Sequence, residues 1–409
     1  MIVKCSPALL VAMCAMAQTT TPTVSTLHSF EGAPGDGAGP IAGLVIGGSG
    51  VLYGTTSNGG ASNQGTVFSL KPPTSTGGSW TETVLHNFSG PDGALPGTTL
   101  AIGSGGVLYG TTAEGGSGSC PGGCGTVFSL TPSDGGWTEA MLYNFTGGSD
   151  GSNPTGLTIG AGRVLYGTTN NIDSAGVGTV FSLTPPASAG GAWTESVLHT
   201  FTGPDGGFPE AGVVQGTGGA LYGTTYSGGA TDVGVVFRLT PPASPGGTWK
   251  ETVIHSFTGS DGGFISAGVA IGSGGVLYGT ASLVGGSGDG TVYSLAPPLA
   301  GSNAWTIDVL CAFSGSNGNS PAAGVTIGEG GVLYGTTTVG GASGNGVVFS
   351  LTPPSMAGGS WSEKVLHSFT GSPEGSDPNA VLAIGGNGVL FGTTTGGGTA
   401  NLGTVFAVF

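Results

Sequence analysis

A tripeptide of the form Leu-Tyr-Gly recurs along the chain at nearly constant intervals, and this repeat restricts the fold more than any other feature. Successive copies lie 56 or 57 residues apart. Two further aromatic markers, one in GTVF-like and one in LHxF-like segments, keep the same order and period. Three independent marks that recur together indicate a tandem array of one supersecondary unit. The aromatic residue of the first marker lies at Tyr53, Tyr109, Tyr166, Tyr222, Tyr278, Tyr334 and Phe391.

Each unit contains four short runs of strand-like composition. In the fifth unit these runs cover residues 268–272, 276–280, 290–295 and 305–313. Glycine-rich, Pro-Pro and Asp-Gly segments separate the runs, and no stretch carries a sustained helical period. Four strands per unit, seven units and a period near that of kelch repeats predict an all-β fold. We expect a seven-bladed β-propeller with four antiparallel strands per blade.

The two ends of the repeat array predict how the ring closes. The array opens with a strand of the outer-rim type at residues 24–30 and ends on a third-strand segment at residues 403–409. We expect the N-terminal strand to close the last blade as its fourth strand. This arrangement explains why six Trp residues serve seven rim strands, since the opening strand lacks one. Residues 24–409 are therefore predicted to form one domain of repeats of about 56 residues.

The first residues have the organisation of a secretory signal peptide. Lys4 supplies a basic start, residues 8–15 are apolar, and Ala15-Met16-Ala17 is an A-x-A cleavage signal. The apolar run is far shorter than the roughly 20 residues that cross a bilayer. We expect a signal peptide at 1–17, a short linker at 18–23, and a mature protein that is secreted, extracellular or at the cell surface, without a membrane span.

Charge limits the possible partners. Asp and Glu number 21 against 6 Lys and Arg, which gives a formal net charge of −15. Such a surface repels nucleic-acid phosphate and anionic lipid. We therefore expect no nucleic-acid partner. The predicted protein is a monomer whose partner, if it has one, is an extracellular glycan or a surface protein.

Three cysteines remain once the expected signal peptide is removed. Cys120 and Cys124 flank Pro-Gly-Gly in a loop that is longer than its counterparts in other units. Export to an oxidising compartment favours a local disulfide between them, whereas a metal site would need two more ligands nearby. We predict the disulfide, and we expect Cys311 to be a buried odd thiol.

The repeated segments GGVLYGTT, GTVFSLTPP and WTETVLHSF-like resemble those of a known bacterial family, the tandem-repeat proteins called GloVer repeats. Members are described as "choice-of-anchor" because their C-terminal anchors differ. The resemblance covers residues 24–409. It implies a secreted or surface-exposed protein of propeller type with no established biochemical activity. The chain departs from the anchored members because it ends at Phe409 in a strand-like stretch.

Histidine and glutamate each occupy one repeated place in the rim strand. A residue that recurs in blade after blade is structural rather than catalytic, because an active site is a single constellation of distinct roles. We expect the glutamates to meet water or to pair locally. The histidines are His28, His86, His199, His255 and His367, and the glutamates are Glu82, Glu139, Glu195, Glu251 and Glu363.

Acidic residues also lie in the links that lead from each rim strand to the next inner strand, on the face that carries the variable loops. Asp-Gly is an ordinary turn, and each loop has one acid whereas calcium takes 6 to 8 oxygen ligands. We therefore favour turns and predict no metal ion and no cofactor. The inner strands lack Asp, Glu, His, Lys, Arg and Cys, so we assign no catalytic residue. The candidate ligand-binding residues on this face are Asp92, Asp205, Glu210, Asp261 and Tyr226.

Uniform repeats and the missing catalytic set favour a non-catalytic binding or scaffold propeller that presents a loop-rich face to a glycan, a protein or the cell envelope. The alternative is an extracellular polysaccharide-acting hydrolase or lyase that uses loop carboxylates at the channel mouth. Glycosidases use two carboxyl groups about 5 to 10 Å apart. Two acids such as Asp205 and Glu210 that met across a deep cleft would therefore favour the enzyme.

Overall fold

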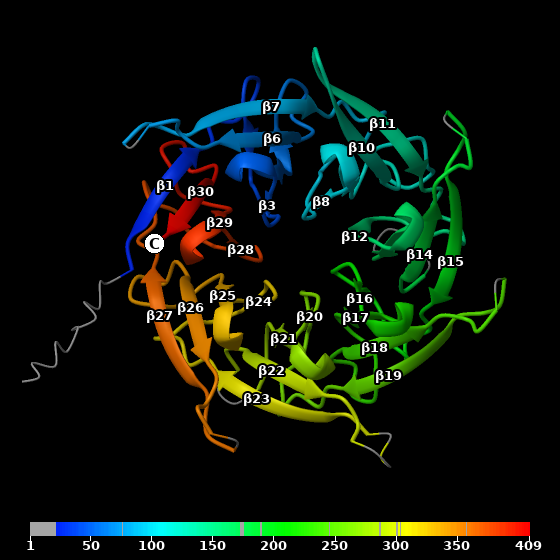
Figure 1. Cartoon of the computed structure of the whole chain (residues 1–409), viewed down its shortest axis with the longest axis vertical. Helices are drawn as coiled ribbons and strands as arrows, with labels where there is room; N and C mark the ends of the chain where they lie inside the picture. Colours follow the sequence, from blue (N-terminus) through cyan, green and yellow to red (C-terminus); the bar gives the residue numbers. More distant parts are fainter. Residues whose placement is uncertain are drawn as a thin grey trace, which may run out of the picture.

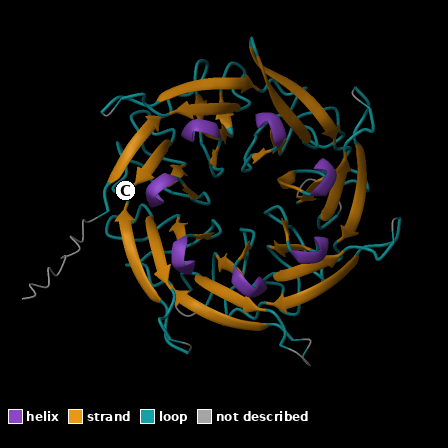
Figure 2. Ribbon diagram, in the orientation of Figure 1, coloured by secondary structure: helices purple, strands orange, loops and turns teal. Residues whose placement is uncertain are grey.

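Seven sheets surround a central axis, and each sheet has four antiparallel strands (Figure 1). One short 3₁₀ turn per sheet lies toward the inner side of the ring (Figure 2). The computed structural model describes residues 22–75, 77–171, 176–188, 190–244, 246–285, 288–299, 302, 304–356 and 358–409. The predicted all-β, seven-bladed propeller is confirmed. The expected signal peptide at 1–17 lies outside the described residues, and within them no helix is long and apolar enough to cross a membrane.

Every blade runs from a short inner strand to a long outer strand. Blades 1 to 4 consist of β3 (Val45–Ile46), β4 (Leu52–Thr56), β6 (Thr66–Lys71) and β7 (Thr81–Asn87); β8 (Ala101–Ile102), β9 (Leu108–Thr112), β10 (Thr126–Ser133) and β11 (Gly136–Asn144); β12 (Pro154–Ile159), β13 (Leu165–Thr169), β14 (Thr179–Thr184) and β15 (Thr194–Thr200); and β16 (Val214–Gln215), β17 (Leu221–Thr225), β18 (Val235–Thr240) and β19 (Lys250–Ser256).

Blades 5 to 7 repeat the same order. They consist of β20 (Ala270–Ile271), β21 (Leu277–Ala281), β22 (Thr291–Ala296) and β23 (Thr306–Ala312); β24 (Thr326–Ile327), β25 (Leu333–Thr337), β26 (Val347–Thr352) and β27 (Ser362–Ser368); and β28 (Ala383–Ile384), β29 (Leu390–Thr394), β30 (Thr404–Val408) and β1 (Val24–Ser29). A small extra ladder joins β2 (Gly37–Ala38) to β5 (Asn58–Gly59).

The seventh blade takes its outer strand from the other end of the chain. β1 pairs antiparallel with β30, with Val24 opposite Val408 and Ser29 opposite Thr404. The two strands lie side by side in Figure 1, β1 in blue and β30 in red. Thr23 and Phe409 extend the ladder, because the Phe409 amide donates to the Thr23 carbonyl at 3.0 Å.

Aromatic residues pack the blades against one another. Phe88 at the end of one rim strand meets Phe128 of the next blade edge to face, with ring centroids 5.1 Å apart. Such a geometry contributes about 0.5–1.5 kcal/mol beyond the burial of the rings. The same contact recurs around the ring between Phe30 and Phe68, Phe145 and Phe181, Phe201 and Phe237, Phe257 and Tyr293, Phe313 and Phe349, and Phe369 and Phe406.

The Leu-Tyr-Gly marker has two packing roles. Its tyrosine contacts the tryptophan of the following blade, as between Tyr222 and Trp305, whose ring centroids are 6.0 Å apart. Its glycine lets a third-strand ring cross the second strand closely. A Cβ atom at Gly54 would lie 2.6 Å from Cζ of Phe68, so glycine is required there.

A β-bulge lies just before the histidine position of each rim strand. In β19, Val253 pairs with Phe237 and His255 pairs with Val236, which leaves Ile254 as the extra residue. Bulges re-aim side chains. Ile254 packs into the hydrophobic core between blades, and His255 turns toward the link that follows the strand.

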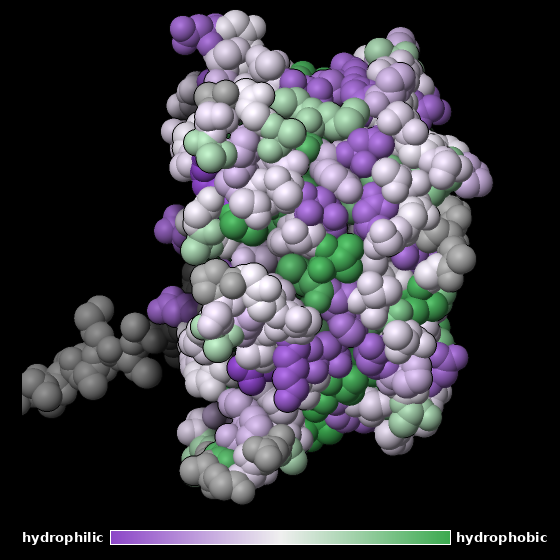
Figure 3. All heavy atoms as spheres, turned by 90° about the vertical axis from the view of Figure 1, so that its right-hand side faces the viewer, coloured by the Kyte–Doolittle hydropathy of each residue, from purple (hydrophilic) through white to green (hydrophobic). Residues whose placement is uncertain are grey.

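The outer wall of the ring is mixed in character. Figure 3 shows hydrophobic residues dispersed among hydrophilic and small ones on the side that carries blades 3 and 4. Exposed hydrophobic residues on the outer strands include Met141, Val197 and Val309. Two cavities lie at the channel and its mouth.

Candidate functional site

The links between rim and inner strands shape the mouth of the channel. Each contains one residue in the left-handed conformation, such as Phe208 with φ +54°, which non-glycine residues rarely adopt. The Phe208 amide donates to the Val177 carbonyl at 2.6 Å, and its carbonyl accepts from the Tyr226 amide at 3.0 Å. These contacts fix the direction of the residues that follow. The equivalent residues are Gly39, Leu95, Asn153, Phe264, Ser320 and Asp377.

Glu210 lies at the channel mouth, two residues after Phe208. The hydrogen bonds of Phe208 hold the backbone that leads to Glu210. On its other side, the Ala211 carbonyl accepts a hydrogen bond of 2.8 Å from Oγ1 of Thr168 in the preceding blade. The backbone is thus held both before and after Glu210. Because the backbone is held on both sides, the carboxyl group of Glu210 moves mainly by rotation of its side chain.

The channel mouth opens into a cavity of about 550 Å³ that residues of all seven blades line. Threonine, serine, asparagine, alanine, glycine and aliphatic side chains make up its wall. Glu210 is the one ionisable side chain among the described residues that line it. In the other blades the position of Glu210 is taken by Ile41, Gly97, Thr155, Ser266, Ala322 and Asn379.

A second cavity, of about 530 Å³, adjoins the first on the side of blades 1 to 3. Both cavities share Ile41, Thr98, Thr155 and Glu210 in their walls. Loop amides and hydroxyl groups extend the polar lining outward from the mouth. These residues include Ser57, Asn58, Asn153 and Asn170.

The surroundings of Glu210 change its acidity. Glu210 is solvent-exposed at the mouth, and partial desolvation by the surrounding loops raises the pKa of its carboxyl group, while a hydrogen bond from Ser266 opposes part of this rise. Oγ of Ser282 lies 3.3 Å from Oγ of Ser266 and extends this polar contact into blade 5. Glu210 is therefore a stronger base, when ionised, than a free carboxylate.

The structure places the three predicted ligand-binding aspartates away from these cavities. Oδ2 of Asp92 lies 2.9 Å from Nε2 of His86, and Oδ1 accepts the Ser89 amide at 2.9 Å. Burial acts to raise the pKa of Asp92, but these hydrogen bonds outweigh it and the pKa is lowered. Equivalent pairs join His28 to Asp36, His199 to Asp205, His255 to Asp261 and His367 to Glu374.

Tyr226, the remaining predicted residue, supports the mouth rather than lining it. Its ring packs on Phe264 with centroids 5.2 Å apart, and its amide binds Phe208. Asp205 and Glu210 do not meet in a cleft, since Glu210 lines the cavities and Asp205 does not. Sequence reasoning selected Glu210 but missed Ser266. The signal was available, because Ser266 holds the same repeat position one blade later.

The repeated rim glutamates lie against the aspartates of the preceding blade. Burial raises the pKa of each to about 7 at Glu82, Glu139, Glu195 and Glu251, and the nearby aspartate adds to the rise. One oxygen of each of these carboxyl groups is buried without a hydrogen-bond partner. They are therefore partly buried groups at the blade junctions.

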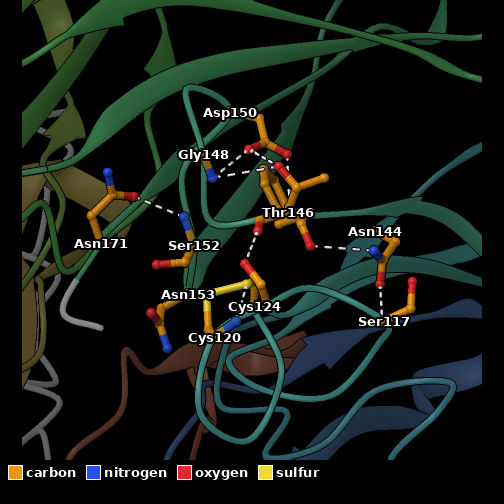
Figure 4. Close-up of a disulfide and its surroundings, with 12 residues drawn as sticks. Ser117, Cys120, Cys124, Asn144, Thr146, Gly148, Asp150, Ser152, Asn153 and Asn171 are labelled. Atoms are coloured by element: carbon orange, nitrogen blue, oxygen red, sulfur yellow. Dashed lines mark hydrogen bonds between the residues drawn. A yellow bond between two sulfur atoms is a disulfide. The ribbon is translucent and has the colours of Figure 1, made fainter. Parts of the chain in front are cut away.

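Figure 4 shows the loop that carries the predicted disulfide. Cys120 and Cys124 are bonded to each other, and the Cys120 amide donates to Sγ of Cys124 at 3.0 Å. Oδ1 of Asn144 accepts the Ser117 amide at 2.7 Å, which ties the same loop to β11. Cys311 is a free, partly buried thiol.

Solved structures share this architecture at low sequence identity. A streptogramin B lyase structure has a TM-score of 0.54 at 15% identity, covering 95% of this chain and 97% of the other. A putative 6-phosphogluconolactonase from Bacteroides uniformis has a TM-score of 0.50 at 18% identity, covering 84% and 88%. The extracellular domain of a putative one-component system from B. thetaiotaomicron has a TM-score of 0.54 at 10% identity, covering 93% and 40%. No curated protein matches this sequence.

These comparisons correct our main functional expectation. We expected a non-catalytic binding or scaffold propeller, whereas the similar solved structures include a lyase and a putative lactonase. At such identities the likeness shows the fold alone, and because enzymes also have this fold, a uniform propeller does not by itself indicate a non-catalytic protein. The expectation rested on the absence of ionisable residues from the inner strands. The ionisable group at the channel, Glu210, lies just before an inner strand.

One family accounts for the whole repeat array. The Gloeobacter/Verrucomicrobia repeat matches residues 15–215, 117–305 and 164–406. These overlapping matches span all seven blades. The chain therefore belongs to the Gloeobacter/Verrucomicrobia repeat family.

Proposed function

We propose that the channel mouth is an active site and that the protein is an extracellular hydrolase or lyase of neutral carbohydrate, with Glu210 as the general base. One observation carries this proposal. Seven equivalent positions surround the mouth, and Glu210 alone supplies an ionisable group to the cavity of about 550 Å³. A single distinct residue within a uniform repeat is what a catalytic role requires.

The chemistry of Glu210 fits a general base. Partial desolvation raises the pKa of Glu210 above its ordinary value, which strengthens proton abstraction, and a hydrogen bond from Ser266 restrains the carboxyl group. In hydrolysis Glu210 takes a proton from water while the water oxygen attacks an ester or lactone carbonyl carbon of the carbohydrate; the C–O bond to the leaving oxygen then breaks, and that oxygen takes the proton back from Glu210. In elimination Glu210 takes the proton from the carbon beside the carbonyl group of an esterified, and therefore neutral, sugar acid; the bond from the next carbon to the leaving oxygen breaks, and that oxygen takes up the proton. Both reactions need one base.

A two-carboxylate glycosidase mechanism is less compatible with this cavity. That mechanism needs a second carboxyl group about 5 to 10 Å from the first. The described lining residues offer Glu210 and no other carboxyl group. The favoured reactions are therefore base-assisted hydrolysis or elimination.

The wall of the cavity favours a neutral, hydroxyl-rich substrate. Thr98, Thr155 and Asn379 offer hydroxyl and amide groups, while Ile41 and Val381 offer apolar surface. Neither cavity has a Lys or Arg among its described lining residues, and the chain carries a net charge of −15. A polyanionic substrate would be repelled.

The proposal also includes export. The N-terminal pattern supports cleavage after Ala17 and release to the cell exterior or its surface. We further propose that the released protein is a monomer. N-terminal sequencing of the exported protein is expected to begin at Gln18, and light scattering is expected to give the mass of one chain. A retained N-terminus or a stable oligomer would contradict this part.

A substrate screen tests the enzymatic proposal. Purified mature protein is incubated with acylated neutral polysaccharides, sugar lactones and methyl-esterified polyuronates, and the products are identified by mass spectrometry. Hydrolysis adds water to the products, whereas elimination leaves an unsaturated sugar. We expect turnover by the native protein and loss of turnover in Glu210→Gln. Turnover that persists in Glu210→Gln would overturn the proposal.

A further inference from the structure

Three donor groups converge where blades 3 and 4 meet at the outer rim. His199 belongs to β15, Asp205 to the link that follows it, and Glu251 to β19 of the next blade. Within the described part of the chain, these three residues form the group whose donor atoms all lie within 4.8 Å of one another. One imidazole nitrogen and two carboxylate oxygens make a set that first-row metals bind.

The carboxyl group of Glu251 has an unsatisfied atom at this junction. Its Oε1 is buried and has no hydrogen-bond partner, as is the case for the equivalent atoms of Glu82, Glu139, Glu195 and Glu363, but at this junction alone among the described residues do a histidine and an aspartate place their donor atoms within 4.8 Å of it. Asp205 supplies no donor, because an ionised carboxylate only accepts hydrogen bonds: its Oδ1 accepts from the Thr202 amide and hydroxyl at 2.8 Å each, and its Oδ2 faces Nε2 of His199 at 3.0 Å. Leaving a buried polar atom unpaired is costly, and such an atom calls for a water or an ion.

The spacing of the His199 and Asp205 donor atoms suits a small tetrahedral ion, and the donor atom of Glu251 lies within 4.8 Å of both. Zinc bonds of about 2.0–2.2 Å place two ligand atoms of a tetrahedral site about 3.3 Å apart. Nε2 of His199 and Oδ2 of Asp205 are already 3.0 Å apart. Thr202 holds the other oxygen of Asp205, which is the outer-shell support that metal-ligating carboxylates usually have.

We propose that His199, Asp205 and Glu251 bind a divalent transition-metal ion, with zinc as the best-fitting candidate, and that the ion links the outer strands of blades 3 and 4. The fourth position would hold water. This site is distinct from the channel mouth and does not depend on the function proposed for Glu210. Calcium fits less well, because it takes 6 to 8 oxygen ligands.

The repeat provides a built-in comparison one junction along. Between blades 4 and 5, Nε2 of His255 lies 2.9 Å from Oδ2 of Asp261, and Thr258 holds Oδ1 of Asp261 as Thr202 holds that of Asp205. Ile307 of blade 5 occupies the position of Glu251 in blade 4, because each residue pairs with the leucine of the third strand in its own blade. The histidine and the aspartate are present there, and the third ligand is missing.

Zinc titration of the mature protein, freed of metal by EDTA and dialysis, tests the proposal. Isothermal titration calorimetry with zinc chloride near pH 7.5 is expected to show that the native protein binds one equivalent of zinc tightly. Glu251→Gln, which preserves the size of the side chain, is expected to weaken the affinity for this zinc ion at least tenfold. Zinc bound at this site should then no longer raise the melting temperature. His255→Ala, the matched control, is expected to leave the stoichiometry and affinity of zinc binding unchanged.

A gain-of-site variant makes the test independent of any loss of folding. Ile307→Glu restores the third ligand between blades 4 and 5, so this variant is expected to bind one zinc ion more than the native protein. Absence of zinc binding by the native protein would overturn the proposal. Equal zinc binding by Glu251→Gln and the native protein would also overturn it, because the ion would then sit elsewhere.

Discussion

The ring of Phe30 packs edge to face on the ring of Phe68, with centroids 5.2 Å apart, and so joins the last blade to the first. Phe30 directly follows β1, which is hydrogen-bonded to β30, and its side chain is fully buried. The N-terminal strand therefore takes part in two contacts, one within blade 7 and one between blades 7 and 1. The stability of the whole ring should depend on it.

Replacement of Phe30 by alanine tests this dependence. We expect Phe30→Ala to lower the free energy of unfolding by about 3–5 kcal/mol, because it empties a closely packed site. Urea denaturation measures the change. Phe409→Ala is the control, since Phe409 is 62% exposed at the end of the same blade, and it should change the free energy by less than about 0.5 kcal/mol. Equal effects of the two variants would contradict the closure.

The histidine–aspartate pairs should contribute stability rather than activity. Asp92→Ala removes the acceptor for His86 and for the Ser89 amide, so we expect a loss of about 1–3 kcal/mol in the free energy of unfolding. Turnover at the channel mouth should be unchanged. Asp134→Ala, at an exposed turn, is the matched control and should be neutral. A stable Asp92→Ala protein that had lost activity would show a functional role instead.

Stability should fall as the pH rises through neutrality. Glu82, Glu139 and Glu195 have folded-state pKa values near 7, above the ordinary value of 4.5. The folded state therefore binds more protons than the unfolded state between about pH 4.5 and 7. The contribution of these groups is complete below that window and is lost as the pH rises through it.

The aspartates of the pairs act in the opposite sense at lower pH. The pKa of Asp36 and of Asp92 lies below the ordinary value of 3.8, so their contribution is lost as the pH falls below that value. In EDTA-treated protein we expect the melting temperature to be highest near pH 5 and lower at pH 8. The triple change of Glu82, Glu139 and Glu195 to Gln should flatten the slope between these values. A melting temperature at pH 8 that matched or exceeded the value at pH 5 would contradict this account.

Periodicity was sufficient to predict the fold, because each marker has a fixed packing partner in the next blade. The Leu-Tyr-Gly tyrosines, for example, meet the rim tryptophans, as Tyr222 meets Trp305. The site was less predictable. Asp205 and Glu210 are five residues apart, yet the left-handed turn at Phe208 separates their environments, one at a blade junction and the other at the channel. No local sequence pattern reports that separation.

Contacts between blades were the other feature that sequence reasoning could not supply. From the sequence we expect Glu251 to face solvent from a rim strand. In the structure one of its oxygens is buried, and its carboxyl group lies near His199 and Asp205 of the preceding blade. The distance between these groups depends on the angle between blades. Only the assembled ring defines that angle.

The rate of the Glu210→Gln variant tests the central claim most directly. On the best substrate from the screen, kcat should fall by about 10²–10⁴-fold, as expected for loss of a general base, while KM changes little. Asp134→Asn should retain the native kcat. The native kcat should rise with pH as Glu210 ionises, with a midpoint above the usual carboxyl range. A Glu210→Gln protein that kept the native kcat would contradict the assignment of the channel mouth as the active site.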